Sequence, residues 1–234
     1  MSQTQQMTII AHIRSDFREK FGIPRQSGIV NELESMIVFE PAYRNMDALR
    51  GLEQFSHLWL IWLFSENVRE GWTPTVRPPR LGGNERVGVF ASRSPFRPNE
   101  IGLSCVKLQY IEKEKELGPV IHVTGADLLD GTPIFDIKPY LPYVDSHPEA
   151  EGGFAEEHKN YHLQIDFPEG LLEKVPENKR NALCGVLGED PRPAYQRDPD
   201  RIYGMYFAGC EVSFRVRQDT LEVLDVCRVC REDG

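Results

Sequence analysis

The chain has 234 residues, of which 40% are hydrophobic and 27% are charged, a composition typical of a globular protein. It contains no run of about 18 uncharged apolar residues, which excludes a membrane-spanning helix, and its first residues lack the basic and apolar segments of a secretory signal. Five cysteines, an odd number, argue against a disulfide-rich secreted scaffold, so we expect a cytoplasmic protein.

The net charge of −9 is unevenly distributed along the chain. Residues 1–144 carry 16 basic and 17 acidic side chains, whereas residues 145–234 carry 11 and 19. This difference predicts a boundary near residues 145–155, and we expect two domains, residues 1–147 and 148–234. The overall acidity argues against DNA as a partner, because non-specific DNA binding depends on neutralising phosphates with cations.

The first part of the chain consists of short runs rich in β-branched residues, separated by proline and glycine. Such a pattern favours a mainly β fold, a barrel or a sandwich, over alternating strands and helices. We expect one short helix at residues 45–54. The predicted strands span residues 7–13, 36–39, 58–64, 87–91, 101–108, 120–123 and 134–137.

The second part of the chain predicts a smaller α+β unit. Residues 145–168 are polar and irregular, which is typical of a linker or of a loop beside a site. Apolar residues at helical spacing then predict a helix over about residues 168–187. Three further strands are expected at residues 202–207, 211–216 and 221–228.

Several common catalytic and cofactor motifs are absent. No two glycines are spaced two residues apart, so the Rossmann dinucleotide fingerprint does not occur, and there is no phosphate-binding P-loop or nucleophile elbow. Cys227 and Cys230 form a single C-x-x-C pair, whereas a structural zinc site needs two more ligands. We therefore expect no metal site.

An arginine-rich stretch stands out in this acidic chain. Residues 69–97 hold six arginines against two glutamates, interleaved with prolines that stiffen the loops and with the aromatic residues Trp72 and Phe96. Arginines on stiff loops bind an anion at a low entropic cost. Equally, these arginines could pair with the protein's own carboxylates, and composition leaves both interpretations open. The candidate anion-binding residues are Arg77, Arg80, Arg93 and Arg97.

The segment SRSPFRPNEIG at residues 92–102 resembles the signature of the TsaA-like family, also called TrmO. The resemblance extends over essentially the whole chain, through residues 24–28, 50–59, 77–84, 127–133, 136–142 and 190–195. It implies a β-barrel core that binds S-adenosylmethionine without a Rossmann sheet, usually in a homodimer. The implied activity is N6-methylation of N6-threonylcarbamoyladenosine at position 37, in the anticodon loop of threonine tRNA.

The resemblance also assigns residues to the methyl donor. The chain departs from the expected pattern at Ser65 and Glu66, where we expect a His-Gln pair in relatives, and at Ser27, where proline is frequent. The residues carried over by motif are Gln26, Ser27, Gly28, Ser65, Glu66, Arg93, Leu103, Thr124, Gly125, Ala126 and Asp127.

The chemistry of the implied substrate selects further residues. Its threonyl carboxylate needs a cation, for which the fork of an arginine is the best geometric match. Unpaired bases of the anticodon loop can stack on aromatic side chains. We therefore expect the substrate to contact Arg77, Arg80, Phe96, Arg97 and Asn99.

Methyl transfer from a sulfonium is an in-line displacement, in which positioning should dominate. The carbonyl attached to N6 acidifies the N6 proton, so a weak base, or the substrate itself, suffices. Asp130 is the candidate base, although an Asp-Gly pair such as Asp130-Gly131 is more often a turn. Two other classes remain open: a non-catalytic RNA- or nucleotide-binding module, and a hydrolase that uses Asp127 and Asp130.

Overall fold

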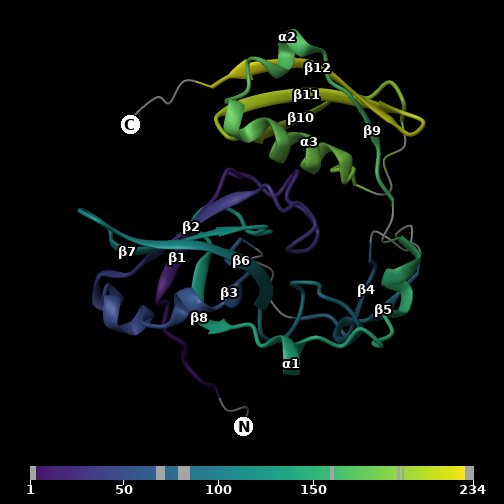
Figure 1. The fold of residues 1–234 in the computed structure, drawn as a ribbon. Helices are drawn as coiled ribbons and strands as arrows, with labels where there is room; N and C mark the ends of the chain where they lie inside the picture. Colours follow the sequence, from purple (N-terminus) through teal and green to yellow (C-terminus); the bar gives the residue numbers. More distant parts are fainter. Residues whose placement is uncertain are drawn as a thin grey trace.

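The computed structural model describes residues 4–66, 72–78, 85–158, 161–193, 196 and 198–229, with the side chains of residues 157 and 158 left out. They form two larger sheets, one before residue 140 in what we call the barrel unit and one after residue 163 in what we call the C-terminal unit (Figure 1). Within the described ranges, no helix is long and apolar enough to cross a membrane.

The barrel unit is a closed barrel of six antiparallel strands in the hydrogen-bonded order β1-β2-β7-β6-β3-β8, in which β8 pairs back to β1. Closure satisfies both edges of the sheet, which would otherwise be open to pairing with another chain. The strands are β1 (Ala11–Arg14), β2 (Glu34–Phe39), β3 (His57–Leu63), β6 (Ile101–Glu114), β7 (Gly118–Thr124) and β8 (Pro133–Pro139).

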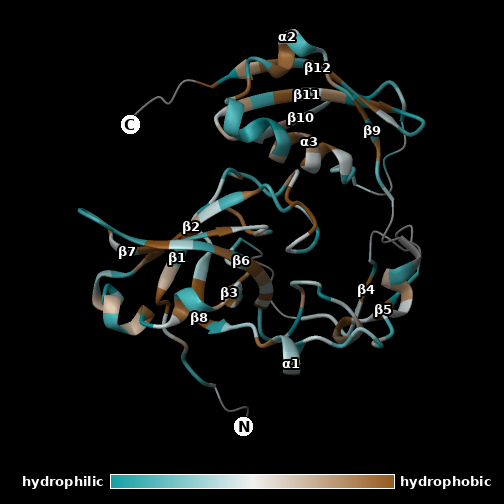
Figure 2. Ribbon diagram, in the orientation of Figure 1, coloured by the Kyte–Doolittle hydropathy of each residue, from teal (hydrophilic) through white to brown (hydrophobic). Residues whose placement is uncertain are grey.

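Alternation of side chains fills the interior of the barrel. Along β3, Leu58, Leu60 and Trp62 are buried and their neighbours are half-buried, as the period of two in a strand requires. Trp62 needs the absence of a side chain at Gly102, because a Cβ there would lie 2.2 Å from the indole Cε2. Figure 2 shows apolar residues concentrated on the strands of both units.

Residues 40–56 form three short 3₁₀ helices rather than the single helix predicted over residues 45–54. Gly51, which precedes the third of them, has a φ of +87°, a conformation that an α-helix does not contain. The predicted strand at 87–91 is also shorter than expected, because the chain turns into a 3₁₀ helix at Val89. The elements here are η1 (Pro41–Tyr43), η2 (Met46–Leu49), η3 (Leu52–Gln54), the paired β4 (Thr75–Val76) and β5 (Val87–Gly88), η5 (Val89–Ala91) and α1 (Pro142–Asp145).

The C-terminal unit is a four-stranded sheet in the order β10-β11-β12-β9, covered by helices. The single helix predicted over residues 168–187 is wrong, because Pro176 has an extended backbone and lacks an amide hydrogen, and so interrupts it. The three predicted strands are confirmed, and the short parallel strand β9 was not predicted. The elements are η6 (Gly153–His158), β9 (Gln164–Asp166), α2 (Glu169–Leu172), η7 (Glu177–Lys179), α3 (Arg180–Gly188), β10 (Tyr203–Phe207), β11 (Cys210–Arg217) and β12 (Thr220–Arg228).

The segment between β1 and β2, residues 15–33, leaves the barrel and lies under α3 of the C-terminal unit (Figure 1). We call it the arm. Phe17, Val30 and Leu33 of the arm are buried in the same apolar core as the C-terminal sheet and α3. The two units therefore keep separate sheets but share one of the two cores of the molecule.

Candidate functional site

The tip of the arm meets the barrel beside β6. Pairing between β6 and β7 starts with Lys107 opposite Thr124, and just before that point the amide of Cys105 donates to Ser27 Oγ over 3.0 Å. The amide of Gly28 donates to the carbonyl of Gly125 over 2.8 Å. Residues 26–28, which we call the arm turn, thus lie against β6 and against the segment that follows β7, which brings several of the residues assigned by motif together.

Two glycines allow this close approach. Gly28 and Gly125 have φ angles of +76° and +77°, a region that side chains disfavour. A Cβ on Gly125 would also lie 3.4 Å from both the Cα and the amide nitrogen of Gly28. The arm turn can therefore contact the end of β7 backbone to backbone.

The carboxylate of Asp127 is connected to the barrel interior. The indole Nε1 of Trp62 donates to Ser104 Oγ over 2.9 Å, and Ser104 Oγ donates to Asp127 Oδ1 over 2.6 Å. Burial raises the pKa of the Asp127 carboxyl, whereas the hydrogen bonds from Ser104 and from the backbone of Ser27, and the charge of Arg93, oppose this shift. A half-buried acidic group thus lies directly behind the arm turn.

Arg93 joins the arginine-rich stretch to the arm turn. Its guanidinium donates to the side-chain oxygen of Gln26, so two predicted donor-site residues contact each other although 67 positions separate them. Leu103, another of these residues, is 54% exposed on the outer face of β6, next to Ile101, which is 37% exposed. The site therefore combines an exposed apolar strip with charged groups of both signs.

Ser65 and Glu66 follow the end of β3 and are exposed. The Nζ of Lys20, on the arm, donates to the carbonyl of Glu66 over 2.7 Å, which brings this segment to the arm. Both side chains face solvent, so neither residue is part of the barrel core.

The arginines of the stretch differ in what they contact. One nitrogen of Arg97 donates to the carbonyls of Ser92 and Ser94 at 3.0 and 3.3 Å, so its guanidinium braces the loop that carries Arg93. Arg93 and Arg97 therefore donate to neutral oxygens and keep their charge uncompensated by these partners. Arg77 and Asn99 are exposed, and Arg80 lies outside the described residues.

An aromatic pair lies near these loops. Trp72 and Phe90 are stacked with ring centroids 6.2 Å apart, and they are 49% and 72% exposed. Phe96 is half-buried. Sequence reasoning identified Trp72 and Phe96 but missed Phe90, whose signal was its place at the end of a predicted strand.

Asp130 lies in the turn before β8. Its Oδ1 accepts the amide of Ser15 over 3.0 Å and its own amide donates to the carbonyl of Phe17, so it anchors the start of the arm. Gly131 follows with a φ of +78°. These contacts match the turn interpretation of the Asp-Gly pair, and the role of Asp130 as a base stays a prediction.

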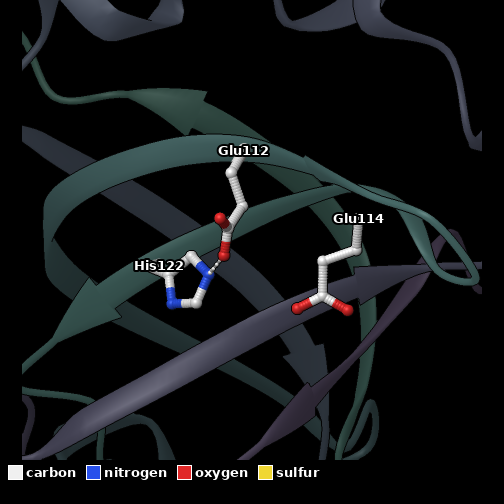
Figure 3. A group of neighbouring side chains, drawn as sticks. All are labelled: Glu112, Glu114 and His122. Atoms are coloured by element: carbon white, nitrogen blue, oxygen red, sulfur yellow. Dashed lines mark hydrogen bonds and ion pairs between the residues drawn. The ribbon is translucent and has the colours of Figure 1, made fainter.

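A second cluster of polar side chains lies on the β6–β7 hairpin (Figure 3). Glu112 Oε1 is 2.7 Å from Nε2 of His122, and ligand atoms of Glu112, Glu114 and His122 lie within 4.8 Å of one another, close enough to share a metal ion. Tyr110 stacks on the ring of His122. The sequence signal for this cluster, which the sequence analysis missed, is a pair of glutamates two residues apart on one strand face.

At the C-terminus, Cys227 donates to Asp225, and Cys230 lies outside the described residues.

The closed antiparallel barrel, with the arm turn and the loop that carries Arg93 beside it, defines a fold without a Rossmann sheet. Residues 12–146 match the family model of the tRNA-methyltransferase O N-terminal domain, and residues 160–229 match that of the TrmO C-terminal domain. The chain belongs to the TrmO family, which confirms the resemblance and the mainly β fold with a smaller α+β unit.

Curated relatives and solved structures agree with this assignment. The chain is 40% identical to the tRNA (adenine(37)-N6)-methyltransferase of Escherichia coli (strain K12), over 92% of this chain and 94% of that one. It is 39% identical to the putative S-adenosylmethionine-dependent methyltransferase RcsF of Pseudomonas aeruginosa, over 95% and 98%. The crystal structure of TrmO from P. aeruginosa superposes with a TM-score of 0.79 at 33% identity, covering 97% of this chain and 99% of that chain.

Proposed function

We propose that this chain is an enzyme that transfers the methyl group of S-adenosylmethionine to N6 of adenine 37 in tRNA. The finer proposal is that the substrate is N6-threonylcarbamoyladenosine in the anticodon loop of threonine tRNA, and that the enzyme acts in the cytoplasm as a homodimer. Membership in the TrmO family supports the class of reaction. One structural observation supports the location of the proposed site: the arm turn, Arg93, Asp127 and the exposed face of β6 lie together.

The residues present fit the methyl donor, whose bound form supplies an electrophilic methyl group on a sulfonium. Leu103 and Ile101 offer an apolar surface of the kind on which a nucleobase packs. Asp127 offers a negative charge that complements a cation, and Arg93 offers a fork that complements a carboxylate. The remaining assigned residues, from the arm turn to Ser65, Glu66, Thr124, Gly125 and Ala126, frame this surface with backbone groups.

The loop that carries Arg93 and Arg97 fits the acceptor. The guanidinium of Arg97, which donates to the carbonyls of Ser92 and Ser94, supports binding of an anion such as the threonyl carboxylate or a backbone phosphate. The exposed pair of Trp72 and Phe90 suits bases splayed out of an anticodon loop. Arg77, Arg80, Phe96 and Asn99 complete the proposed contact surface for tRNA.

The proposed transfer needs alignment more than acid–base strength. The nitrogen N6 attacks the methyl carbon as the bond from sulfur breaks, and the N6 proton is lost to a weak base. Because the carbamoyl carbonyl withdraws electron density from N6, the ionised carboxylate of Asp130 or Asp127, or the substrate itself, suffices as acceptor of the N6 proton. The main task of the protein is to hold both reactants in line.

Steady-state methylation of one threonine tRNA, prepared with and without the threonylcarbamoyl group, tests the proposal. We expect kcat/KM to fall on the order of ten thousand-fold without the group, because an arginine that lacks its carboxylate is left unpaired. Equal values for the two tRNAs would contradict the substrate proposal. Binding of tRNA with no transfer of label from the donor would instead support a non-catalytic RNA-binding module.

A further inference from the structure

The arm turn is flanked on both sides by residues that belong to the core of the C-terminal unit. Phe21 and Ile23 precede it, and Ile29 and Val30 follow it, and all four pack in the apolar cluster formed with β10–β12 and α3. Val30 is 3% exposed and lies two residues after Gly28. The position of the arm turn is therefore set from the C-terminal side of the molecule.

The opposite side of the arm turn is held by polar contacts to the barrel. These are the hydrogen bond from the amide of Gly28 to Gly125 and the one from the amide of Cys105 to Ser27 Oγ. Two hydrogen bonds contribute little net stability by themselves, whereas buried apolar side chains contribute much more. The apolar contacts thus determine the position of the arm. The two hydrogen bonds to the barrel are the measurable sign that the arm turn lies against it.

One close apolar contact is between Val30 and α3. A Cβ on Gly185 would lie 2.7 Å from Cγ1 and 3.5 Å from Cγ2 of Val30, so the helix backbone itself forms the wall against this valine. Valine is restricted at χ1, so the side chain cannot rotate away from an added methyl group. Any side chain at position 185 must displace Val30 and the arm with it.

A lysine of the C-terminal unit joins the two ends of the arm region. Lys179 Nζ lies 2.9 Å from Asp16 Oδ2, near the start of the arm, and 3.1 Å from Glu34 Oε2, just after its end. The lysine side chain is only 17% exposed, so the pair with Asp16 is partly shielded from water. Charge and packing thus act on the same segment.

We infer that the C-terminal unit positions the methyl-donor site, with Gly185 and Lys179 as positioning residues that act through Val30 and the arm. This inference rests on the proposed function, because it takes the arm turn as part of the donor site. It gives the C-terminal unit a role in the reaction besides any contact with tRNA.

The test replaces Gly185 by alanine in the full-length protein. Alanine favours a helix more than glycine does, so the substitution does not weaken α3 itself. We expect faster amide hydrogen exchange at Gly28 and Cys105, and a donor dissociation constant raised about ten-fold by calorimetry, which corresponds to about 1.4 kcal/mol. Gly188→Ala is the matched control in the same helix, because nothing lies within 4 Å of its added Cβ.

Removing the obstruction should restore the site. In the double variant Gly185→Ala with Val30→Ala, we expect donor affinity and exchange at Gly28 to return toward the parent values. Lys179→Met is measured as well, so that a Gly185→Ala protein that fails to fold still leaves a test. It should speed exchange at Gly28 and weaken donor binding with the barrel fluorescence unchanged.

Two outcomes are decisive against the inference. If Gly185→Ala and Lys179→Met leave exchange at Gly28 and donor affinity unchanged, the C-terminal unit does not position the arm turn. If exchange quickens but donor affinity does not change, the arm is positioned without consequence for the donor. Gln26→Ala then tests the proposed donor site separately from the positioning role of the C-terminal unit. An unchanged donor affinity in that variant refutes the donor site itself.

Discussion

At the scale of single residues, Asp127 has the environment with the clearest consequence. Its carboxyl lies between Ser104, which extends from the barrel interior, and the backbone of the arm turn. Because burial favours the neutral form, the native state binds this proton more tightly than the unfolded chain does. The group thus links the protonation state of the site to the stability of the fold.

This linkage predicts how Asp127→Asn changes the pH dependence of stability. The folded pKa of Asp127 is raised, so its ionisation costs stability at neutral pH, and this cost disappears as the pH falls through the raised value toward the unfolded value of about 3.9. The parent should therefore gain stability relative to the variant over this window. Urea unfolding of both proteins from neutral pH to pH 4 measures the difference, and parallel curves would contradict it.

Motifs predicted the residues of the site better than their interactions. The contact between Gln26 and Arg93 joins two motif residues, but the chain from Trp62 through Ser104 to Asp127 includes members that no motif marked. Such a chain depends on the register between β3 and β6, which local sequence does not encode. Val30 could not be identified from the sequence, because a buried valine in a loop has no periodic apolar pattern around it.

At the scale of elements, apolar runs were predictable and interruptions were not. The continuous apolar run at residues 58–64 predicted β3, whereas the shift from β5 to a 3₁₀ helix at Val89 had no comparable signal. The predicted helix over 168–187 failed at Pro176, where a local steric rule outweighs helical spacing. β6 continues to Glu114, beyond the predicted residue 108, because its last, charged residues pair with residues 118–120 of β7. These charged residues carry no apolar pattern that could have predicted the extension.

The register between β3 and β6 makes a prediction for Gly102. Alanine at this position would place its Cβ 2.2 Å from the ring of Trp62, which is 7% exposed inside the barrel. We expect Gly102→Ala to lower the free energy of unfolding by roughly 1–3 kcal/mol, the usual cost of overpacking a core.

Denaturant unfolding measures this loss, with Gly88→Ala as the control, because nothing lies within 4 Å of a Cβ at Gly88. Adding Trp62→Phe to the Gly102→Ala protein should recover part of the loss. If the Gly102→Ala protein is as stable as the Gly88→Ala protein, the ring of Trp62 does not pack tightly against the backbone of β6 at Gly102.

At the scale of the whole molecule, the charge difference along the chain suggested two domains, and each half does form its own sheet. The arm crosses that division, because it belongs to the first half of the chain and packs with the second. Phe17, Val30 and Leu33 precede the predicted boundary at 147 by more than a hundred positions, yet they are buried with the C-terminal sheet. Sequence-local features cannot reveal a core shared between segments this far apart.

The shared core predicts that the intact chain unfolds in one step. Separating the units would expose the buried side chains of the arm to water, which opposes a state with only one unit folded.

All three tryptophans lie in the barrel unit, so their fluorescence follows that unit alone, while amide exchange in β11 and β12 follows the C-terminal unit. We expect the two probes to give the same urea midpoint, as a two-state transition requires. Gly185→Ala, which pushes on the contact between the units, should lower both midpoints together, whereas Gly188→Ala should lower neither. Loss of protection in β11 at a urea concentration where the fluorescence is still native in the parent would show that the C-terminal unit folds independently, and that the arm is only a surface contact.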